Sequence, residues 1–326
     1  MTFRKIAAFA GLLALGACNP QQLGQRGLTQ RLSVATGGTG GVYYPYGGGI
    51  AKVISTHIDG VEATAEVTAG TVDNLKFLKN RSADVAFALA DSLDEAARGT
   101  GPFAEFGAVP ARALAVLYDN YNHLVTLVGK DIETVADLKG KVVSAGAPGS
   151  GTEVSAFRIL EAAGLNPAAD IRKQSLGAAQ SADALKDDKI DAFFWSGGIP
   201  TGALLDLAST PARTIKLVPN GDVLAGLEQR FGTGVYHTSM IPKETYPGMA
   251  SHVMVISVSN VLVAHEEMDE ELAYRITKAL FDHRDELVAI HPEAENLTLG
   301  SAVKGSPVPF HPGAIRYYRE QGAWKD

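Results

Sequence analysis

Apolar and polar residues after position 31 repeat one pattern: a short apolar run, a loop of small residues, and a stretch with helical spacing. In the first repeat the apolar run is Leu32–Ala35, the loop is Thr36–Gly41, and Pro45–His57 has the spacing of a helix. Further runs typical of strands cover 62–67, 84–89, 113–118, 124–128, 141–144, 171–175 and 191–195. Strands that alternate with helices predict an α/β fold.

The same pattern predicts two domains, which are called lobes below. It starts afresh after the polar cluster Asp119–Asn122, which we interpret as the crossing into a second lobe. The long β-type run Val253–Val263 is suited to cross back, and a helix expected over Asp269–Ile290 would return the tail to the first lobe. A chain of 326 residues is long enough for two cores. We therefore expect one lobe from 31–121 with about 253–326, and the other from 122–252.

The N-terminal residues have the pattern of a secretory signal peptide. Arg4 and Lys5 precede the apolar run Ile6–Leu15, which is too short to span a bilayer. The following Leu15-Gly16-Ala17-Cys18 is similar to a bacterial lipobox. We expect a signal peptide over 1–17, lipidation of Cys18, a flexible tether over 18–30, and a periplasmic body held at a membrane by the lipid alone. Ordinary cleavage, with Cys18 lost or incidental, is the alternative.

The composition argues against several kinds of partner and site. The 29 basic and 36 acidic residues give a net charge of −7 without long blocks of either sign, which disfavours nucleic acid as a partner. One Cys excludes an internal disulfide and a Cys-rich metal site, and the eight His show no metal-ligand spacing. We expect neither a metal nor a cofactor.

Glycine-rich loops follow four of the expected strands, where ligands bind in open α/β sheets. Glycine lets the backbone approach a ligand closely, and the N–H groups at a helix start bind an anion such as a carboxylate. The alternative for any one loop is a tight turn without a ligand. The loops are Thr36–Gly41, Ala69–Thr71, Gly146–Thr152 and Ser196–Gly198.

Other binding and catalytic motifs fit poorly. The first loop lacks the third glycine of a dinucleotide fingerprint, and Gly146–Thr152 lacks the Lys of a phosphate-binding P-loop. Ser150 lacks the glycine pattern of a hydrolase nucleophile elbow, and His265 lacks the second His of a zinc protease. Asp91 and Asp191, near strand ends, are better explained by capping or structural hydrogen bonds than by catalysis.

Five motifs and the C-terminal tail resemble the TAXI-class solute-binding proteins of TRAP (tripartite ATP-independent periplasmic) transporters, over nearly all of 32–322. The longest is Thr36-Gly37-Gly38-Thr39-Gly40-Gly41-Val42-Tyr43-Tyr44-Pro45. The others are Gly70–Leu75, Asp137–Val142, Gly146–Glu153, Ile190–Phe194 and, in the tail, His311–Tyr318. The resemblance implies a two-lobed periplasmic binding protein, not an enzyme, that closes over a small organic anion such as glutamate or 2-oxoglutarate. It also implies delivery of that anion to TRAP membrane subunits, by a receptor expected to be a monomer.

The resemblance also implies a set of ligand-binding residues. Backbone N–H groups and hydroxyls from both lobes would hold a carboxylate. Tyr43 and Tyr44 would wall the pocket, although core packing is the alternative for them. Ser92, Trp195 and Gly197 are included because they end strands that face the same cleft. The expected set is Thr36, Gly37, Gly38, Thr39, Tyr43, Tyr44, Ser92, Ser150, Gly151, Thr152, Trp195 and Gly197.

Three other functions remain open. The same fold serves ATP-driven importers, although the TAXI-like motifs speak against that partner. Porphobilinogen-deaminase-like enzymes use related lobes but attach their cofactor through a Cys in the body, and this chain has no Cys after Cys18. A surface adhesin or structural lipoprotein with a vestigial pocket belongs to a different class.

Overall fold

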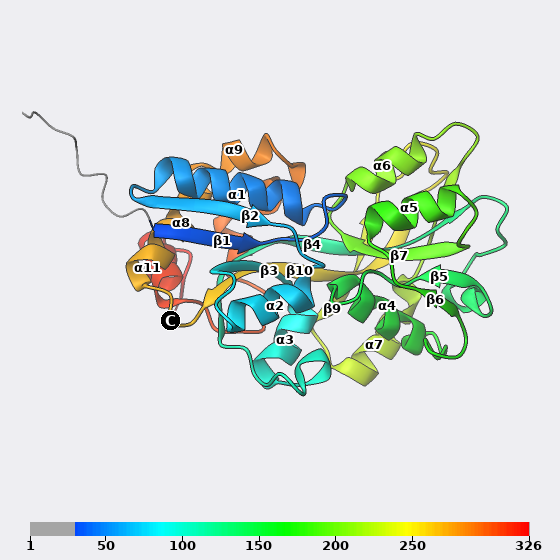
Figure 1. Ribbon diagram of the computed structural model, residues 1–326, viewed down its shortest axis with the longest axis horizontal. Helices are drawn as coiled ribbons and strands as arrows, with labels where there is room; N and C mark the ends of the chain where they lie inside the picture. Colours follow the sequence, from blue (N-terminus) through cyan, green and yellow to red (C-terminus); the bar gives the residue numbers. More distant parts are fainter. Residues whose placement is uncertain (1–29, 326) are drawn as a thin grey trace, which may run out of the picture.

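A mixed β-sheet runs through the middle of the molecule, with helices on both of its faces (Figure 1). The computed structural model describes residues 30–325, so the expected signal peptide and Cys18 lie outside the described residues. Within this range ten strands form one sheet in the order β2-β1-β3-β10-β4-β7-β5-β6, with β8 beside β4 and β9 beside β10. Gln30, expected as the last residue of the tether, is already the first residue of β1.

The first lobe is built from βα units at the N-terminal end of the chain. Parallel pairing joins β1 to β2 and to β3, as the repeated strand–helix pattern predicts. Helix α1 covers one face of this part of the sheet, and α2 and α3 cover the other (Figure 1). The elements are β1 (Gln30–Ala35), α1 (Tyr43–His57), β2 (Val61–Glu66), α2 (Thr71–Lys79), β3 (Val85–Leu89), α3 (Ala90–Arg98) and η1 (Gly101–Phe103).

The second lobe repeats the arrangement, with α5 and α6 on one face and α4 and α7 on the other (Figure 1). Its parallel strands are β5, β6 and β7. The expected strands at 141–144, 171–175 and 191–195 are all present, whereas β8, β9 and α6 were not predicted. The elements are η2 (Val135–Leu138), β5 (Val142–Ser144), α4 (Gly151–Ala162), β6 (Arg172–Gln174), α5 (Ala178–Lys186), β7 (Ala192–Gly197), α6 (Gly202–Ala208), β8 (Ile215–Val218), η3 (Gly221–Val223), α7 (Leu224–Phe231) and β9 (Tyr236–Ile241).

Two long antiparallel strands, β4 (Ala111–Leu127) and β10 (Val253–His265), belong to both lobes. The expectation of two separate strands at 113–118 and 124–128 is therefore wrong, because both belong to β4. Asp119–Asn122, interpreted as the crossing, lie inside this one strand, where its pairing passes from β10 to β7. Their side chains bond across the crossing instead of facing solvent, as Asp119 does with Ser259 and His237, and Asn120 with Asn260. The expected crossing strand at 253–263 is confirmed, and Ser257 pairs with Tyr121 at the middle of it.

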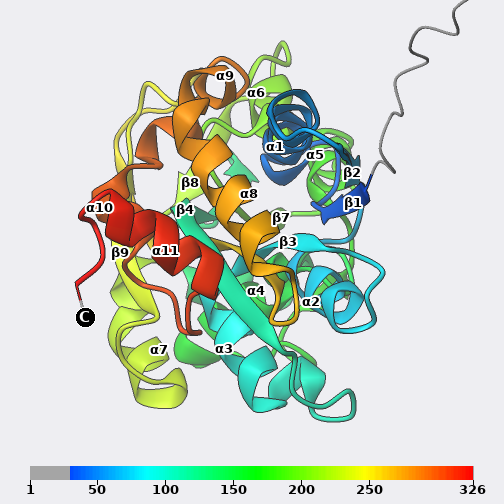
Figure 2. The same cartoon turned by 90° about the vertical axis from the view of Figure 1, so that its left-hand side faces the viewer.

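The C-terminal tail packs on the first lobe, as expected (Figure 2). The helix expected over Asp269–Ile290 is divided, because His283 leaves helical geometry between α8 and α9 and lets α9 turn onto α1. Helix α11 lies across α8 near the end of β4 (Figure 2). The elements are α8 (Glu270–Asp282), α9 (Arg284–Val288), η4 (Pro292–Asn296), α10 (Leu299–Ala302) and α11 (Pro312–Glu320). Among the described residues, none of these or the earlier helices combines the length and apolar character that a membrane span requires.

Candidate functional site

A cavity of about 320 Å³ opens between the lobes, at the carboxyl ends of the parallel strands. Loops that follow β1, β2, β5, β6 and β7 line it, so both lobes contribute. This is the position at which α/β sheets bind ligands, because strand ends, loops and helix starts converge there. The volume lies in the range of small-molecule sites.

Four helices begin at this cavity. The lining includes the residues at the starts of α1, α2, α4 and α5, two helices from each lobe. Each helix N-terminus carries about half a positive charge, from N–H groups that lack intrahelical acceptors. The cavity is therefore electropositive even though no side chain of Lys, Arg or His lines it.

The start of α4 shows which N–H groups remain for a ligand. The N–H of Ser150 donates to Ala147 O at 3.1 Å, and the N–H of Glu153 donates to Ser150 Oγ at 3.1 Å. Gly151 and Thr152 are the other two of the four N–H groups that a helix start leaves without an intrahelical acceptor. Both line the cavity, so their N–H groups are the natural donors to an anion.

The start of α2, on the opposite side, has the same organisation. The N–H of Gly70 donates to Thr68 Oγ1 at 3.1 Å, and the N–H of Asp73 donates to Gly149 O at 3.1 Å. Thr71 lines the cavity and is the first residue of the helix. Gly70 has a φ of +127°, which a residue with a side chain rarely adopts, so glycine is required for this approach to α4.

Aromatic and amide side chains complete the wall. The Tyr43 hydroxyl donates to the Asn260 side-chain oxygen, and the buried Tyr118 hydroxyl has no partner among the described residues. Burial raises the pKa of both phenols above their usual value, so both stay neutral. Trp195 is held by a 2.9 Å hydrogen bond from Nε1 to Thr201 Oγ1. Asn120 and Gln180 supply neutral amides, and no Asp or Glu is present in the lining.

Nine of the twelve expected ligand-binding residues line this one cavity. They come from both lobes. The nine are Gly37, Gly38, Thr39, Tyr43, Ser150, Gly151, Thr152, Trp195 and Gly197.

The structure does not place the other three in the cavity. Thr36 is buried in the first lobe, where its hydroxyl donates to Glu66 O at 2.6 Å. Tyr44 is 37% exposed, because α1 begins at Tyr43 and the helical turn directs the next side chain away. Ser92 is fully buried in α3, where its N–H donates to Asp91 Oδ1 at 2.6 Å. Residue 92 lies inside a helix, not at the strand end that the sequence suggested.

Several lining residues were missed. The segment Leu176–Gln180, which includes the first turn of α5, lines the cavity, but the sequence predicted that this helix begins only at Ser181. Gly177, followed by two alanines, was the sequence signal that could have indicated this earlier helix start. Tyr118 and Asn120 were missed because they were assigned to the end of a strand and to a loop, whereas β4 carries both past the cavity.

The lobes touch at the cavity rim, so the structure is a closed form. Ala203 N donates to Gly40 O at 3.2 Å, and Asp73 N donates to Gly149 O across the opposite rim. A Cβ atom at Gly41 would lie 2.7 Å from the Trp195 ring, and one at Gly151 would lie 2.5 Å from Leu89 Cδ1. Glycine at these positions permits the closure.

A buried charged cluster bridges the lobes beside the cavity. Arg158 of α4 pairs with Asp91 at 3.3 Å and with Glu95, both from α3, and donates to the Tyr236 hydroxyl at 2.7 Å. The Tyr236 hydroxyl in turn donates to Asp91 Oδ2 at 2.6 Å. The Arg158 side chain is 8% exposed and that of Asp91 is fully buried. The neighbouring carboxylates and Tyr236 raise the pKa of Arg158 despite its burial, so the cation persists.

A third contact between the lobes uses one carboxyl group. Glu293 of η4 accepts the N–H of Ile199 at 2.6 Å and the side-chain amide of Asn296 at 2.6 Å. Burial raises the pKa of Glu293 to about 7, although both hydrogen bonds oppose the shift. This carboxyl group therefore changes charge near neutral pH while it lies between the lobes.

Comparisons with known proteins agree with this architecture. The model of a family described as NMT1-like matches residues 34–322. A solved structure from Bordetella bronchiseptica RB50 has a TM-score of 0.52 and 20% identity, over 92% of this chain and 90% of that one. The ligand-binding component of an ABC-type import system from Staphylococcus aureus, solved with zinc bound, has a TM-score of 0.51 and 13% identity, over 90% and 93% of the chains. The periplasmic aliphatic sulphonate binding protein from Escherichia coli has a TM-score of 0.45 and 14% identity, over 89% and 83% of the chains.

Proposed function

The chain belongs to the NMT1-like family, and from this premise we propose that it is an extracytoplasmic solute-binding receptor. It captures a small organic anion between its lobes and delivers it to a membrane permease without chemical change. The observation that carries the proposal is the cavity between the lobes, where four helix N-termini meet and no charged side chain is present. Such a site suits the binding and release of an anion, and its lining contains no His, Asp, Glu, Lys or Cys side chain.

The electrostatics of the cavity favour an anion. Four helix N-termini contribute about +2 in total, at about half a charge each. The acidic residues in the first turns of α2 and α4 are Asp73 and Glu153, and neither lines the cavity. Glu153 is also neutralised by Lys173, whose Nζ lies 3.4 Å from its carboxylate. The field thus matches the charge of one or two carboxylate groups.

The same lining discriminates between glutamate-like and 2-oxoglutarate-like ligands. An ammonium group buried without a carboxylate partner pays a large desolvation penalty. Because no Asp or Glu lines the cavity, we propose an oxo- or dicarboxylate in preference to an α-amino acid. The neutral donors that remain, such as the Tyr118 hydroxyl and the Gln180 amide, suit a carbonyl or carboxylate oxygen.

Thermal denaturation with a ligand panel tests the proposal directly. A compound that binds only the folded state raises the melting temperature, and the rise grows with the ratio of its concentration to its dissociation constant. We expect shifts with 2-oxoglutarate or succinate at concentrations where glutamate gives little or none. No shift across organic anions would instead favour the adhesin or structural lipoprotein. A larger shift with glutamate would leave the receptor function in place but overturn the preference against an ammonium group.

We propose that capture occurs by closure of the lobes about β4 and β10. The ligand contacts helix starts from both lobes, so it stabilises the closed form by contacts that an open form lacks. Small-angle X-ray scattering of the ligand-free and ligand-saturated protein tests this. We expect the radius of gyration to fall on saturation, and an unchanged value would contradict the closing mechanism.

Two classes of membrane transporter are candidates for the partner that receives the ligand. The Staphylococcus aureus protein is a component of an ABC-type import system, which supports an ABC-type importer as the partner. The TRAP partner is supported by the sequence motifs alone. The two drive transport differently, so uptake in cells separates them: an ABC partner requires ATP hydrolysis, whereas a TRAP partner requires an ion gradient. Location in the periplasm, lipid attachment through Cys18 and a monomeric state remain part of the proposal.

A further inference from the structure

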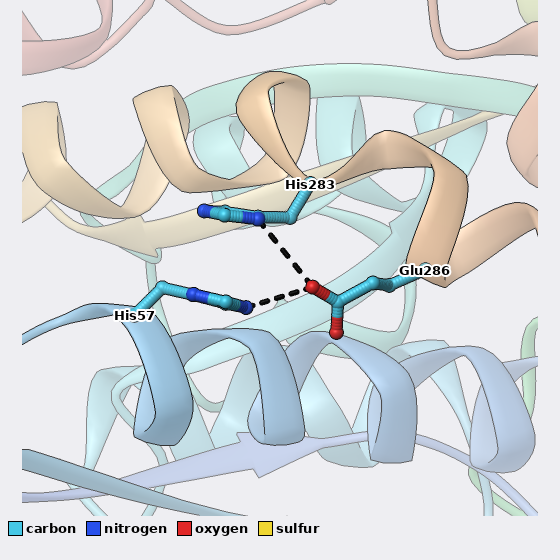
Figure 3. A group of neighbouring side chains, drawn as sticks. All are labelled: His57, His283 and Glu286. Carbon is cyan, nitrogen blue, oxygen red and sulfur yellow. Dashed lines mark hydrogen bonds and ion pairs between the residues drawn. The ribbon is translucent and has the colours of Figure 1, made fainter.

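We propose that His57, His283 and Glu286 form a binding site for a divalent transition-metal ion such as Zn²⁺. The three residues lie on the first lobe, and none of them lines the cavity between the lobes. His57 is the last residue of α1, His283 separates α8 from α9, and Glu286 lies in α9 (Figure 3). This site is independent of the proposed receptor function.

The three side chains converge on one point. Glu286 Oε1 lies 2.8 Å from His57 Nε2 and 3.4 Å from His283 Nδ1. One ligand atom from each residue lies within 4.8 Å of the other two. In a tetrahedral zinc site, bonds of about 2.0–2.1 Å place neighbouring ligand atoms about 3.3 Å apart. Because an imidazole binds a metal in the plane of its own ring, the two parallel rings must tilt toward each other to share one ion.

The two imidazole rings are stacked, with centroids 3.4 Å apart and planes 8° from parallel. A neutral imidazole presents a lone pair to a metal, and two imidazoles with one carboxylate form a donor set that suits Zn²⁺, Ni²⁺ or Cu²⁺.

The surroundings also favour a cation. His57 stands at the C-terminus of α1, where the free carbonyl groups carry about half a negative charge. The three side chains are partly exposed, from 26% to 41%, so an ion can enter from solvent. Three protein ligands leave the fourth tetrahedral position to water.

The consequence of binding is a clamp between α1 and the C-terminal tail. His57 and Glu286 are 229 positions apart, so the spacing of His along the chain contains no metal motif. A bound ion would fix α9 on α1 and raise the stability of the first lobe, because it binds the folded state and not the dispersed ligands of the unfolded chain.

Isothermal titration of ZnCl₂ into the tag-free full chain tests the site. The Cys18→Ser background removes the one thiol that competes for zinc. We expect one ion per chain, and a loss of affinity of at least about tenfold in each of His57→Ala, His283→Ala and Glu286→Gln, because even outer-shell changes cost 10–100-fold. The matched control is His252→Ala, which removes an exposed His of the second lobe and should leave binding unchanged.

Co²⁺ gives a second readout. The chain should develop the visible absorption bands of tetrahedral Co²⁺, and these bands should be absent from the folded Glu286→Gln variant, with folding checked by circular dichroism. Absence of stoichiometric binding to the parent chain would overturn the proposal. Equal binding by the parent and the three variants would also overturn it, since it would locate the ion elsewhere. Neither result bears on capture of an organic anion.

Discussion

Two regions join the lobes by opposite means. The cavity brings backbone N–H groups from four helix starts together and keeps charged side chains out of its lining. The neighbouring cluster of Asp91, Glu95, Arg158 and Tyr236 instead buries formal charges, and its one cation is already paired with two carboxylates. The field of the cavity has no countercharge in its lining, whereas Arg158 has its countercharges within the protein. We infer that the cluster stabilises the contact between the lobes whether or not ligand is bound. The cavity adds stability to this contact only when a ligand occupies it.

The largest loss in the free energy of unfolding should come from Arg158→Met, which removes the cation of the cluster. Asp91 then remains buried without its cation, and removal of one partner of a buried ion pair costs about 3–5 kcal/mol. Urea denaturation should show this loss in the free energy of unfolding. The double variant Asp91→Asn with Arg158→Met should recover part of it, because the fully buried position 91 then carries no charge, although Glu95 still lacks Arg158. Lys186→Met, which breaks the exposed pair with Asp183, is the control and should change little.

If Arg158→Met costs no more than the Lys186 control, the cluster is not the stabilising bridge between the lobes. If the double variant is as unstable as the single one, the loss arises from packing around Arg158, such as its contact with the Phe231 ring, and not from charge.

A smaller change in the free energy of unfolding should come from the ionisation of Glu293, a buried carboxyl group without a cationic partner. Its pKa rises from 4.5 in the unfolded chain to about 7 in the folded one, so the folded state binds the proton more tightly. Its contribution to stability is complete below pH 4.5 and is lost as the pH rises to about 7. At about 1.4 kcal/mol per unit, the loss is at most about 3 kcal/mol.

The measurement is the free energy of unfolding of the parent and of Glu293→Gln between pH 5 and 8. The difference between them should move in favour of the glutamine variant as the pH rises, since glutamine keeps an acceptor for the Ile199 N–H without the charge. A difference that stays constant across this range would show that Glu293 keeps its ordinary ionisation in the fold.

A change of closure geometry should weaken ligand capture with less effect on stability. Gly41→Ala places a methyl group 2.7 Å from the Trp195 ring, which the hydrogen bond to Thr201 holds in place. The rim of the cavity must then open, and we expect the dissociation constant of the organic anion to rise at least about tenfold, or about 1.4 kcal/mol. Calorimetric titration with the best compound of the panel measures this.

Gly48→Ala is the matched control and the smallest expected change. Nothing lies within 4 Å of an added Cβ there, and the residue is inside α1 but outside the cavity. Affinity should be unchanged, and stability should rise by about 0.5–1 kcal/mol because alanine is the better helix former. Equal affinities of the Gly41 and Gly48 variants would show that contact between Gly41 and Trp195 is not needed for capture.

The fold was predictable where local pattern and tertiary position agree. The strand–helix alternation predicted β1, β3, β5 and β7 to within a few residues, because a buried strand must be apolar wherever it lies. The prediction failed at Asp119–Asn122, where polar side chains normally indicate a loop. Here they satisfy partners on β9 and β10, and nothing local distinguishes a polar strand centre from a turn.

The residues of the candidate site could also be predicted in part from the sequence. Loop composition identified Gly37, Thr39, Gly151 and most of their neighbours, because a backbone that approaches a ligand needs glycine and small donors. It also included Ser92, which the structure does not place in the lining, and it missed the start of α5. Both follow from helix starts that lie two or three residues earlier than expected, which changes whether a side chain faces the cavity or the core.

The fold class, much of the alternation of strands and helices, and the Gly-rich loops that follow the strands could be predicted from the sequence, because these depend on short-range periodicity and on backbone freedom. Only the tertiary structure decided that four helix starts point into one uncharged cavity, that Arg158 meets Asp91, and that His57 meets His283 and Glu286. Each of these depends on contacts between residues far apart in the chain. The energy of such contacts comes from burial and mutual orientation, which no local pattern encodes.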